Sequence, residues 1–258
     1  MPTRPRIDMA GYHHIINRGV NRCNVFESVG DKEMFLQILN KISFVHKFIV
    51  HDYCLMDNHY HLLLETTKEN LPDIMRIVNA NYAQYFNKLY NRSGHLWQDR
   101  YKSRYITSDE YLYTLIRYIE YNPLNAGLST SIGAYKFTLS HSIFHAKEHL
   151  PCCNDSLLLR VFDLKTLGEF LEVTMGEDEL AFLEKEQKRK IEKIDNAIVV
   201  ARSKTLEEHF IDANLKEKRN IAVVHAYADG YTQKNIAEFL DVSTSLVSKI
   251  VGRKLYNG

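Results

Sequence analysis

The chain has 258 residues, of which 45% are hydrophobic and 25% are charged, and its formal net charge is +1. This length is enough for one large domain or two smaller ones, and the composition predicts a packed core. The near-neutral charge excludes a uniformly cationic chain, so any contact with nucleic acid must come from local patches.

Other features of the composition narrow the class of protein further. No apolar run reaches the roughly 18 residues that a membrane span needs, and residues 1–6 lack the apolar segment of a signal peptide. Cys23, Cys54, Cys152 and Cys153 form no obvious disulfide framework in a chain of this length. We therefore expect reduced thiols and a cytoplasmic protein.

Residues 10–128 alternate between strand and helix patterns. In chain order we expect a strand at 12–19, a helix at 31–48, a strand at 49–56, a hairpin strand beginning at 59, a helix at 71–90, an extended basic segment at 96–106 and a helix at 107–122. The order β-α-β-β-α-β followed by a helix is the ferredoxin-like, split βαβ pattern. The predicted fold class is α+β with an antiparallel sheet.

Residues 129–198 have a weaker pattern. The stretch 157–172 looks helical, and 176–196 contains a mixed-charge helix that we interpret as a solvated connector. A separate all-α pattern follows. We therefore predict three regions: an α+β domain over 1–128, an extension with a helical connector over 129–198, and a helical domain over 199–258.

The last region has the pattern of a helix-turn-helix over residues 231–250. Ala237 is the small residue where two helices cross, Asp241 tolerates the left-handed turn, and Ser243 caps the second helix. The side chains that would then face a DNA major groove are Thr244, Ser245, Ser248 and Lys249. The alternative is a small helical bundle without a DNA role.

Two histidines two residues apart, His59 and His61, form the most informative motif, in an apolar run that reads as a strand. Alternate side chains of a strand point to the same face, so the two imidazoles stand side by side while Tyr60 points to the other face. Two imidazoles placed this way can hold one metal ion. The alternative is a pair of polar residues on a half-exposed sheet.

The helix expected at 107–122 supplies a candidate nucleophile. Thr107 and Glu110 have the form of a capping box, and Pro123 is expected to stop the helix. Tyr118 and Asn122 are four residues apart and can meet on one face. An amide oxygen can complete a metal site, and a phenol can attack a phosphodiester that the metal polarises.

Several tyrosines compete for this role, because Tyr111, Tyr113 and Tyr121 lie on the same helix. We prefer Tyr118 because Asn122 is its partner. A free tyrosine has a pKa near 10 and is a poor nucleophile unaided.

Four separated motifs agree in order and spacing with those of a known family. They are Gly11-Tyr12-His13-His14-Ile15-Ile16-Asn17-Arg18-Gly19, Met56-Asp57-Asn58-His59-Tyr60-His61, Gly94-His95-Leu96-Trp97-Gln98-Asp99-Arg100-Tyr101 and Tyr118-Ile119-Glu120-Tyr121-Asn122-Pro123-Leu124-Asn125-Ala126-Gly127-Leu128. Over roughly residues 8–150 the chain resembles the REP-associated tyrosine transposases, which belong to the HUH single-tyrosine nuclease superfamily.

The resemblance implies a site and a reaction. It makes His59 and His61 ligands of Mg²⁺ or Mn²⁺, Asn122 the third ligand and Tyr118 the catalytic tyrosine. Tyr118 would attack single-stranded DNA, form a 5′-phosphotyrosine and free a 3′-hydroxyl. Because imidazoles suit softer metals better than Mg²⁺, we expect Mn²⁺ to support activity at least as well.

A basic segment with interleaved aromatic residues marks the expected DNA contact. Cations neutralise phosphates and rings stack on unpaired bases. The candidates in this segment are Arg92, Trp97, Arg100, Lys102 and Arg104, and Arg18 and Arg22 are secondary candidates. The alternative is an ordinary edge strand with solvated charges and a core tryptophan.

The leading hypothesis is a transposase that nicks and joins single-stranded, palindromic hairpin DNA, with duplex DNA bound through the helix-turn-helix. The main alternative is a non-catalytic regulator that binds hairpin and duplex DNA. The single tyrosine and the short domain argue against a relaxase. We expect the nucleoid as the place of action and a monomer or a homodimer as the assembly, since the related enzymes occur as both.

Overall fold

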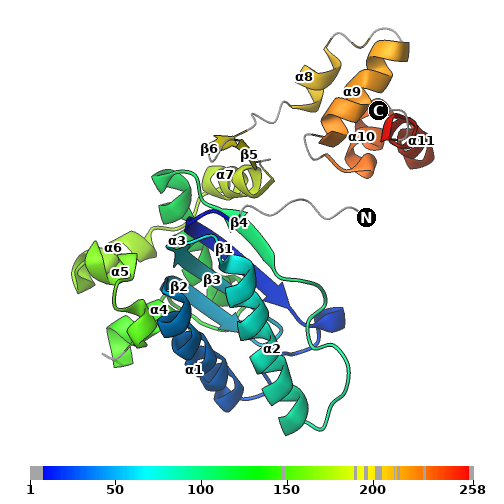
Figure 1. The fold of residues 1–258 in the computed structure, drawn as a ribbon. Helices are drawn as coiled ribbons and strands as arrows, with labels where there is room; N and C mark the ends of the chain where they lie inside the picture. The colour runs from blue at the N-terminus through cyan, green and yellow to red at the C-terminus, as the bar shows by residue number, and fades with distance from the viewer. Residues whose placement is uncertain are drawn as a thin grey trace. The chain divides into compact units, whose positions relative to one another are not determined.

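The structure is a computed structural model that describes residues 8–146, 149–188, 191–194, 197–200, 205–211, 213, 216–228 and 231–255. The chain divides into two compact units, Met1–Leu183 and Glu184–Gly258 (Figure 1). Among the described residues, none of the helices has the length and apolar character needed to cross a membrane. The three regions expected from the sequence, with bounds at 128 and 198, stay a prediction.

The first unit is built on a four-stranded sheet. Its elements are β1 (Gly11–Arg18), a 3₁₀ turn (Val20–Arg22), α1 (Val29–His46), β2 (Phe48–Met56), β3 (His59–Thr66), α2 (Leu71–Leu89), β4 (Lys102–Tyr105) and α3 (Asp109–Asn125). The strands lie in the order β2-β3-β1-β4, and every neighbouring pair is antiparallel. This is the ferredoxin-like, split βαβ arrangement, so the predicted α+β fold class is confirmed.

Helices cover both faces of this sheet (Figure 1). The alternating side chains of β3 distinguish these two faces. Tyr60 points to the face that carries α1 and α2, where its ring packs against Phe35 and its hydroxyl donates to Asn79 Oδ1 at 2.8 Å. His61, the next residue, points to the opposite face and packs against Tyr118 of α3. The alternation of side chains along β3 therefore separates the aromatic core from the candidate site.

Helix α1 begins with a capping box. The Ser28 hydroxyl accepts from the Asp31 backbone N–H at 3.2 Å, and the Asp31 carboxylate accepts from the Ser28 backbone N–H at 2.9 Å. Phe35, Leu39 and Ile42 then follow at helical spacing and are buried against the sheet. Two of the orphan donors at the helix start are thus satisfied, and one apolar stripe faces the core.

Helix α3 differs from the expectation at both ends. Its N-cap is Ser108, whose hydroxyl accepts from the Tyr111 N–H at 3.2 Å, so the expected cap at Thr107 is wrong by one residue. Pro123 lies inside the helix, which continues to Asn125. Proline has no N–H for the carbonyl four residues earlier, and the Asn122 side chain supplies a donor at that place.

The basic segment expected to be extended over 96–106 forms a strand only at Lys102–Tyr105. β4 pairs with β1 over four residues, and before it a single bridge joins Gly19 to Trp97. Trp97 also donates its indole N–H to the Asn79 carbonyl at 3.0 Å, which ties this segment to α2. The segment before Lys102 is therefore held by the bridge and by this contact without forming a continuous strand.

The rest of the first unit packs onto the same core. It contains α4 (Leu139–His141), a π-helical turn (Ser142–Ala146), a 3₁₀ turn (Pro151–Cys153), α5 (Leu157–Arg160), α6 (Leu164–Glu172) and the first part of α7 (Glu177–Lys188), the helix in which the boundary between the two units falls. Leu158, Leu167, Leu171 and Leu183 are buried with the apolar side chains of the sheet. The mixed-charge helix expected over 176–196 ends at Lys188, and Arg189 and Lys190 lie outside the described residues.

The second unit contains a short hairpin and four helices. They are β5 (Ile191–Ile194), β6 (Ala197–Val200), α8 (Leu206–Phe210), α9 (Lys216–Ala228), α10 (Gln233–Leu240) and α11 (Thr244–Leu255). The strands β5 and β6 replace the end of the expected connector helix, in agreement with the β-branched residues of Ala197–Val200.

The helix-turn-helix pattern corresponds to α10 and α11. Asp241 has φ 51° and ψ 50°, the left-handed conformation expected of it, and ends α10. Ile236, Ala237 and Val247 are buried in a core of their own, where Val223 of α9 joins them. The sequence pattern therefore predicted the turn at Asp241 and the core between α10 and α11 correctly.

Candidate nucleic-acid-processing site

The candidate site begins with the sheet face that carries the two histidines of β3. In the antiparallel register, His59 lies opposite Arg18 and His61 lies opposite Ile16 on β1. On the other edge of β1, Ile16 lies opposite Lys102 of β4. Directly opposed residues share a face, so an arginine and a lysine stand on the same surface as both imidazoles.

A cavity of about 400 Å³ opens on this face. It is lined by both histidines, by four cationic side chains and by one carboxylate, together with uncharged neighbours. The four cations are Arg18, Arg22, Arg100 and Lys102, and the carboxylate is Asp99. All four were predicted DNA contacts. A surplus of cations around paired imidazoles favours an anionic ligand such as a phosphate.

His61 is held by a histidine of the neighbouring strand. Its Nδ1 lies 2.9 Å from Nε2 of His14, and the two rings stack with centroids 5.2 Å apart. Both side chains are buried. One ring must donate and the other accept, so the direction of this bond is linked to which nitrogen of each ring carries its proton.

His59 is held by the residue before it. Its Nδ1 lies 2.6 Å from Oδ1 of Asn58, and because an amide oxygen only accepts, the imidazole N–H is at Nδ1. The Nε2 of His59 therefore has its lone pair available. The His59 and His61 rings lie edge to face with centroids 5.2 Å apart.

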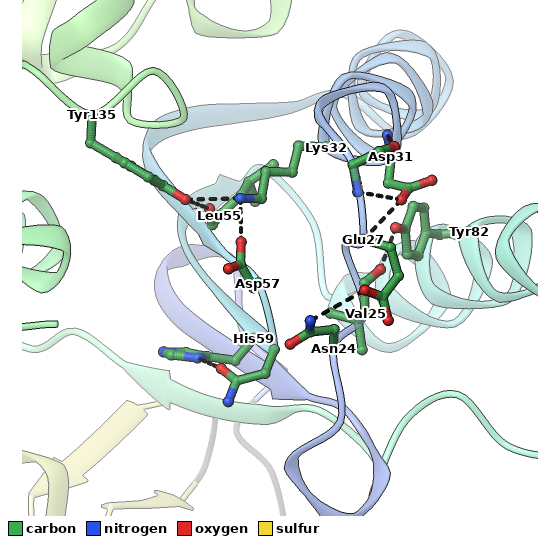
Figure 2. Close-up of polar contacts among 12 residues, drawn as sticks. Asn24, Val25, Glu27, Asp31, Lys32, Leu55, Asp57, His59, Tyr82 and Tyr135 are labelled. Carbon is green, nitrogen blue, oxygen red and sulfur yellow. Dashed lines mark hydrogen bonds and ion pairs between the residues drawn. The ribbon is translucent and has the colours of Figure 1, made fainter. Parts of the chain in front are cut away.

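The turn that carries His59 is anchored from several sides (Figure 2). Lys32 of α1 donates to Asp57 Oδ1 at 2.6 Å and to the Tyr135 hydroxyl at 2.9 Å, and that hydroxyl donates to the Leu55 carbonyl at 2.9 Å. The Asp57 carbonyl also accepts from the backbone N–H of Val25 at 2.8 Å. The β2–β3 turn is thus a rigid support for the first histidine.

Burial keeps the imidazoles of this face neutral. Desolvation, with a smaller contribution from nearby Arg104, lowers the pKa of His14 to about 3. Desolvation also lowers the pKa of His61 well below its usual value, with His14 and His59 adding to the effect. The pKa of His59 is lowered by desolvation and then by Arg18. Neutral imidazoles are the form that binds a metal ion.

Tyr118 of α3 lies next to this pair. Its ring centroid is 5.8 Å from that of His61 and 6.4 Å from that of His14, both in edge-to-face geometry. The side chain is half-buried, and desolvation raises the pKa of its phenol. The structure therefore brings the predicted nucleophile and one predicted ligand together within a single chain.

Asn122 points its amide nitrogen back into its own helix. Nδ2 donates to the Tyr118 carbonyl at 2.7 Å and to the Ile119 carbonyl at 3.4 Å. The amide oxygen takes part in neither bond. Because Pro123 deprives the Ile119 carbonyl of its usual partner, Asn122 has a structural role beside the predicted role of ligand.

The other predicted DNA contacts lie at different places. Arg92 stacks over the Phe86 ring, with Cζ 5.5 Å from its centroid, beyond the end of α2. Trp97 is half-buried, packs edge to face on Tyr60, and lines a second cavity of about 670 Å³ beside α2. Arg104 lies opposite His14 in the sheet. Their contact with DNA stays a prediction.

Two buried carboxyls fasten α3 to the same sheet face. Glu120 accepts from the Ser140 backbone N–H at 2.9 Å and from the Ser140 hydroxyl at 2.5 Å. Asp52 of β2 accepts from the Tyr53 N–H at 2.8 Å, and both carboxyls are fully enclosed. Desolvation first, and then Glu120, raises the pKa of Asp52, while desolvation raises that of Glu120.

Sequence reasoning did not predict the partners of these site residues. His14 belongs to the first of the four motifs, but nothing indicated its bond to His61, which lies 47 residues further along. Glu120 lies two residues from Tyr118, but its burial against β2 has no local signal. The one readable hint was strand alternation, which puts His14 and Arg18 on one face of β1.

The second unit presents its predicted DNA-reading residues to solvent. Thr244, Ser245, Ser248 and Lys249 are all exposed on α11. The Ser243 hydroxyl accepts from the Leu246 N–H at 3.3 Å, so it caps this helix as expected. The helix is thus held at its start while its outer face stays accessible.

The donor set fits a divalent cation with two imidazole ligands. In both histidines Nδ1 is hydrogen-bonded to a neighbouring side chain. Metal-binding imidazoles usually bind the metal through one ring nitrogen and hydrogen-bond to the protein through the other. Among the described residues, no group of three or more His, Cys, Asp or Glu side chains could hold a metal ion. A cation here therefore needs ligands of another kind, such as an amide, water or phosphate oxygen.

Two of the solved structures that match part of this chain are described as transposases, whereas no curated protein matches the chain. A REP-associated tyrosine transposase bound to a REP hairpin is 14% identical over 58% of this chain and 90% of its own, with a TM-score of 0.48. A protein of Deinococcus radiodurans R1, described as a candidate transposase, is 20% identical over 46% of this chain and 95% of its own, with a TM-score of 0.34.

The family model of IS200-like transposases matches residues 9–122. This stretch is less than half of the chain, but it runs from β1 to near the end of α3 and includes His59, His61 and Tyr118. Over residues 9–122 the chain is therefore similar to the IS200-like transposases, in agreement with the resemblance of its four motifs.

Proposed function

We propose that this protein is a metal-dependent nuclease and strand transferase of single-stranded hairpin DNA. The observation that carries the proposal is the position of Tyr118, whose ring lies 5.8 Å from that of His61 in the same chain. No residue of a second copy is needed to bring these two groups together, so a monomer can hold the whole site.

Each side chain of the site has a part in this reaction. His59 and His61 would hold Mg²⁺ or Mn²⁺ through Nε2, with the Asn122 amide oxygen as third ligand. When bound, the metal supplies Lewis-acid polarisation of the scissile phosphate. Arg18 and Lys102, which line the cavity beside the histidines, neutralise the phosphate backbone.

The covalent step is a transesterification at phosphorus. The Tyr118 Oη forms a bond to phosphorus while the bond from phosphorus to the 3′ oxygen breaks. The products are a 5′-phosphotyrosine and a free 3′-hydroxyl, which takes up the proton that the phenol loses. Attack by the same or another 3′-hydroxyl reverses the step and rejoins the DNA, so no nucleotide cofactor is consumed.

Two features support single-stranded hairpin DNA as the substrate class. The four motifs of the chain resemble those of the REP-associated tyrosine transposases, whose substrates are short imperfect palindromes. The cavity at the histidines also has an exposed basic rim, with Arg22 and Arg100, that can accept an unpaired strand. Such an enzyme acts where the DNA is, in the cytoplasm at the nucleoid.

The second unit adds duplex recognition in this proposal. Thr244, Ser245, Ser248 and Lys249 lie exposed at the start of α11, where the recognition helix of a helix-turn-helix contacts base edges and phosphates. Duplex binding by α11 would bring the nuclease to particular flanks, while the first unit acts on the hairpin.

The decisive experiment is a search for a covalent protein–DNA adduct. Full-length protein is mixed with a pool of single-stranded DNA hairpins and Mn²⁺, and the adduct is separated on a denaturing gel and its DNA sequenced. We expect an adduct that disappears in Tyr118→Phe. Tyr121→Phe is the matched control, because Tyr121 is a half-buried phenol of the same helix. Hairpin binding without any adduct would instead support the non-catalytic regulator.

A further inference from the structure

The bond between His14 and His61 has two possible directions with opposite consequences for metal binding. If His14 Nε2–H donates, the His61 proton lies on Nε2, and that nitrogen cannot be a ligand. If His61 Nδ1–H donates, the His61 Nε2 lone pair is available at the cavity that His61 lines. The direction of one 2.9 Å bond therefore decides whether His61 can act as a ligand.

We propose that His14 is a positioning residue whose Nε2 accepts from His61 Nδ1–H and so presents His61 Nε2 to the metal. This inference rests on the proposed function and adds a residue to it. His14 would touch neither metal nor DNA. Metal-binding histidines usually donate their second ring N–H to an oxygen or water acceptor, and here a second imidazole fills that place.

The surroundings of His14 make its bond to His61 important. The ring is completely buried, and its Nδ1 has no hydrogen-bond partner in the described part of the chain. In the proposed direction this Nδ1 carries the His14 proton, so the bond to His61 and the binding of a metal at His61 Nε2 would have to offset the cost of a buried, unpaired N–H. In the sheet register, His14 lies opposite Leu63, one step along the same face from His61.

The same logic applies to His59 with a different acceptor. Asn58 Oδ1 accepts from His59 Nδ1 at 2.6 Å, and the Asn58 side-chain nitrogen lies 3.4 Å from the Arg22 carbonyl, which orients the amide. Both histidines of the motif thus have Nδ1 engaged on the protein side. In this proposal both Nε2 atoms have lone pairs available to a metal ion. Asn58, a neighbour in the sequence, fixes the tautomer of His59, and His14, on another strand, fixes that of His61.

The test compares metal affinity in full-length variants. Mn²⁺ binding is measured by electron paramagnetic resonance for the unmodified protein, His14→Leu, His14→Gln and His13→Leu. We expect His14→Leu to bind Mn²⁺ about 10–100-fold more weakly, as for other outer partners of metal ligands. His14→Gln should recover part of the affinity, because its amide oxygen can accept from His61.

His13→Leu is the matched control. His13 is an equally buried histidine of the same strand, but it points to the other face and contacts the Met9 carbonyl at 2.9 Å. It should leave Mn²⁺ affinity unchanged. If His14→Leu also binds Mn²⁺ like the unmodified protein, the inference is overturned while the metal site stands. If the unmodified protein binds no Mn²⁺, the proposed metal site fails as well.

A second measurement needs no substitution and covers the case in which His14→Leu does not fold. In ¹⁵N-labelled protein with Zn²⁺ as a diamagnetic probe, ring nitrogen shifts report the tautomer of each histidine. We expect the proton on Nδ1 in both His14 and His61. A proton on His14 Nε2 would show that His14 donates, and the inference would be wrong.

Discussion

The two units of this protein differ in the exposure of the polar residues to which we assign a role. In the first unit, four polar side chains in or near the candidate site are buried inside the fold, namely His14, His61, Asp52 and Glu120. In the second unit the predicted DNA-reading side chains of α11 lie on the surface. A change in the first unit is therefore expected to alter stability and chemistry together, whereas a change on α11 should alter binding alone.

The largest effect is expected where a buried carboxyl is removed. Glu120→Ala leaves the buried Ser140 N–H without its acceptor and the Ser140 hydroxyl with only the Thr138 hydroxyl at 3.2 Å, so we expect the free energy of unfolding to fall by about 3 kcal/mol. Urea unfolding followed by the fluorescence of Trp97, the single tryptophan, reports the first unit. Glu172→Ala, at an exposed site on α6, should stay within about 0.5 kcal/mol. Equal stability of the two variants would contradict the comparison.

The next largest effect is expected from replacing His59, the half-buried histidine that we propose as a metal ligand. His59→Ala removes one of two imidazoles, and we expect Mn²⁺ affinity to fall by about 100-fold or more. The loss should be at least as large as that caused by removing a residue that only hydrogen-bonds to a metal ligand. Calorimetric titration of the full-length protein with Mn²⁺ measures this loss. Unchanged affinity, or full adduct formation by His59→Ala, would mean that the metal assignment is wrong.

A pH-dependent effect is expected from Asp52. Burial raises the pKa of Asp52 above its value in the unfolded chain, so the folded state binds more protons between these two values. Stability from this group is therefore present at low pH and is lost as pH rises through the raised pKa. Asp52→Asn removes the ionisable group and should stabilise the first unit at pH 8 by about 1–2 kcal/mol.

The pH series supplies its own control. The advantage of Asp52→Asn should shrink as pH falls and vanish near the ordinary pKa of 3.8, because both forms are then neutral. Urea unfolding of both proteins from pH 8 to pH 4 measures this. An advantage that grows on acidification would show that Asp52 is ionised in the fold.

The smallest effect is expected on the exposed helix. Lys249→Ala should weaken duplex DNA binding several-fold and reduce the slope of log affinity against log salt by about 1. Thermal unfolding and adduct formation on hairpins should not change, because the side chain is exposed. Lys218→Ala, an exposed lysine of α9, is the matched control. Identical salt slopes for the two variants would exclude Lys249 from the duplex contact.

The sequence by itself determined the features that depend on neighbours along the chain. Strand alternation put His59 and His61 on one face. Helical spacing predicted the core of α10 and α11, and the tolerance of Asp for the left-handed conformation predicted the turn at Asp241. The order of strands and helices was enough for the fold class. These features follow from a period of two or of 3.6 residues, which a single segment displays without help from the rest of the fold.

Tertiary structure alone decided which residues meet across the sheet. His14 pairs with His61, Glu120 is enclosed beside Asp52, and the Trp97 indole bonds to α2. Each contact joins positions that lie well apart in the sequence, so it depends on strand register and helix packing, which no local pattern contains. The protonation and hydrogen bonding of such buried groups are set only once the surrounding core has formed. Burial shifts their pKa values, and a buried polar group needs a hydrogen-bond partner.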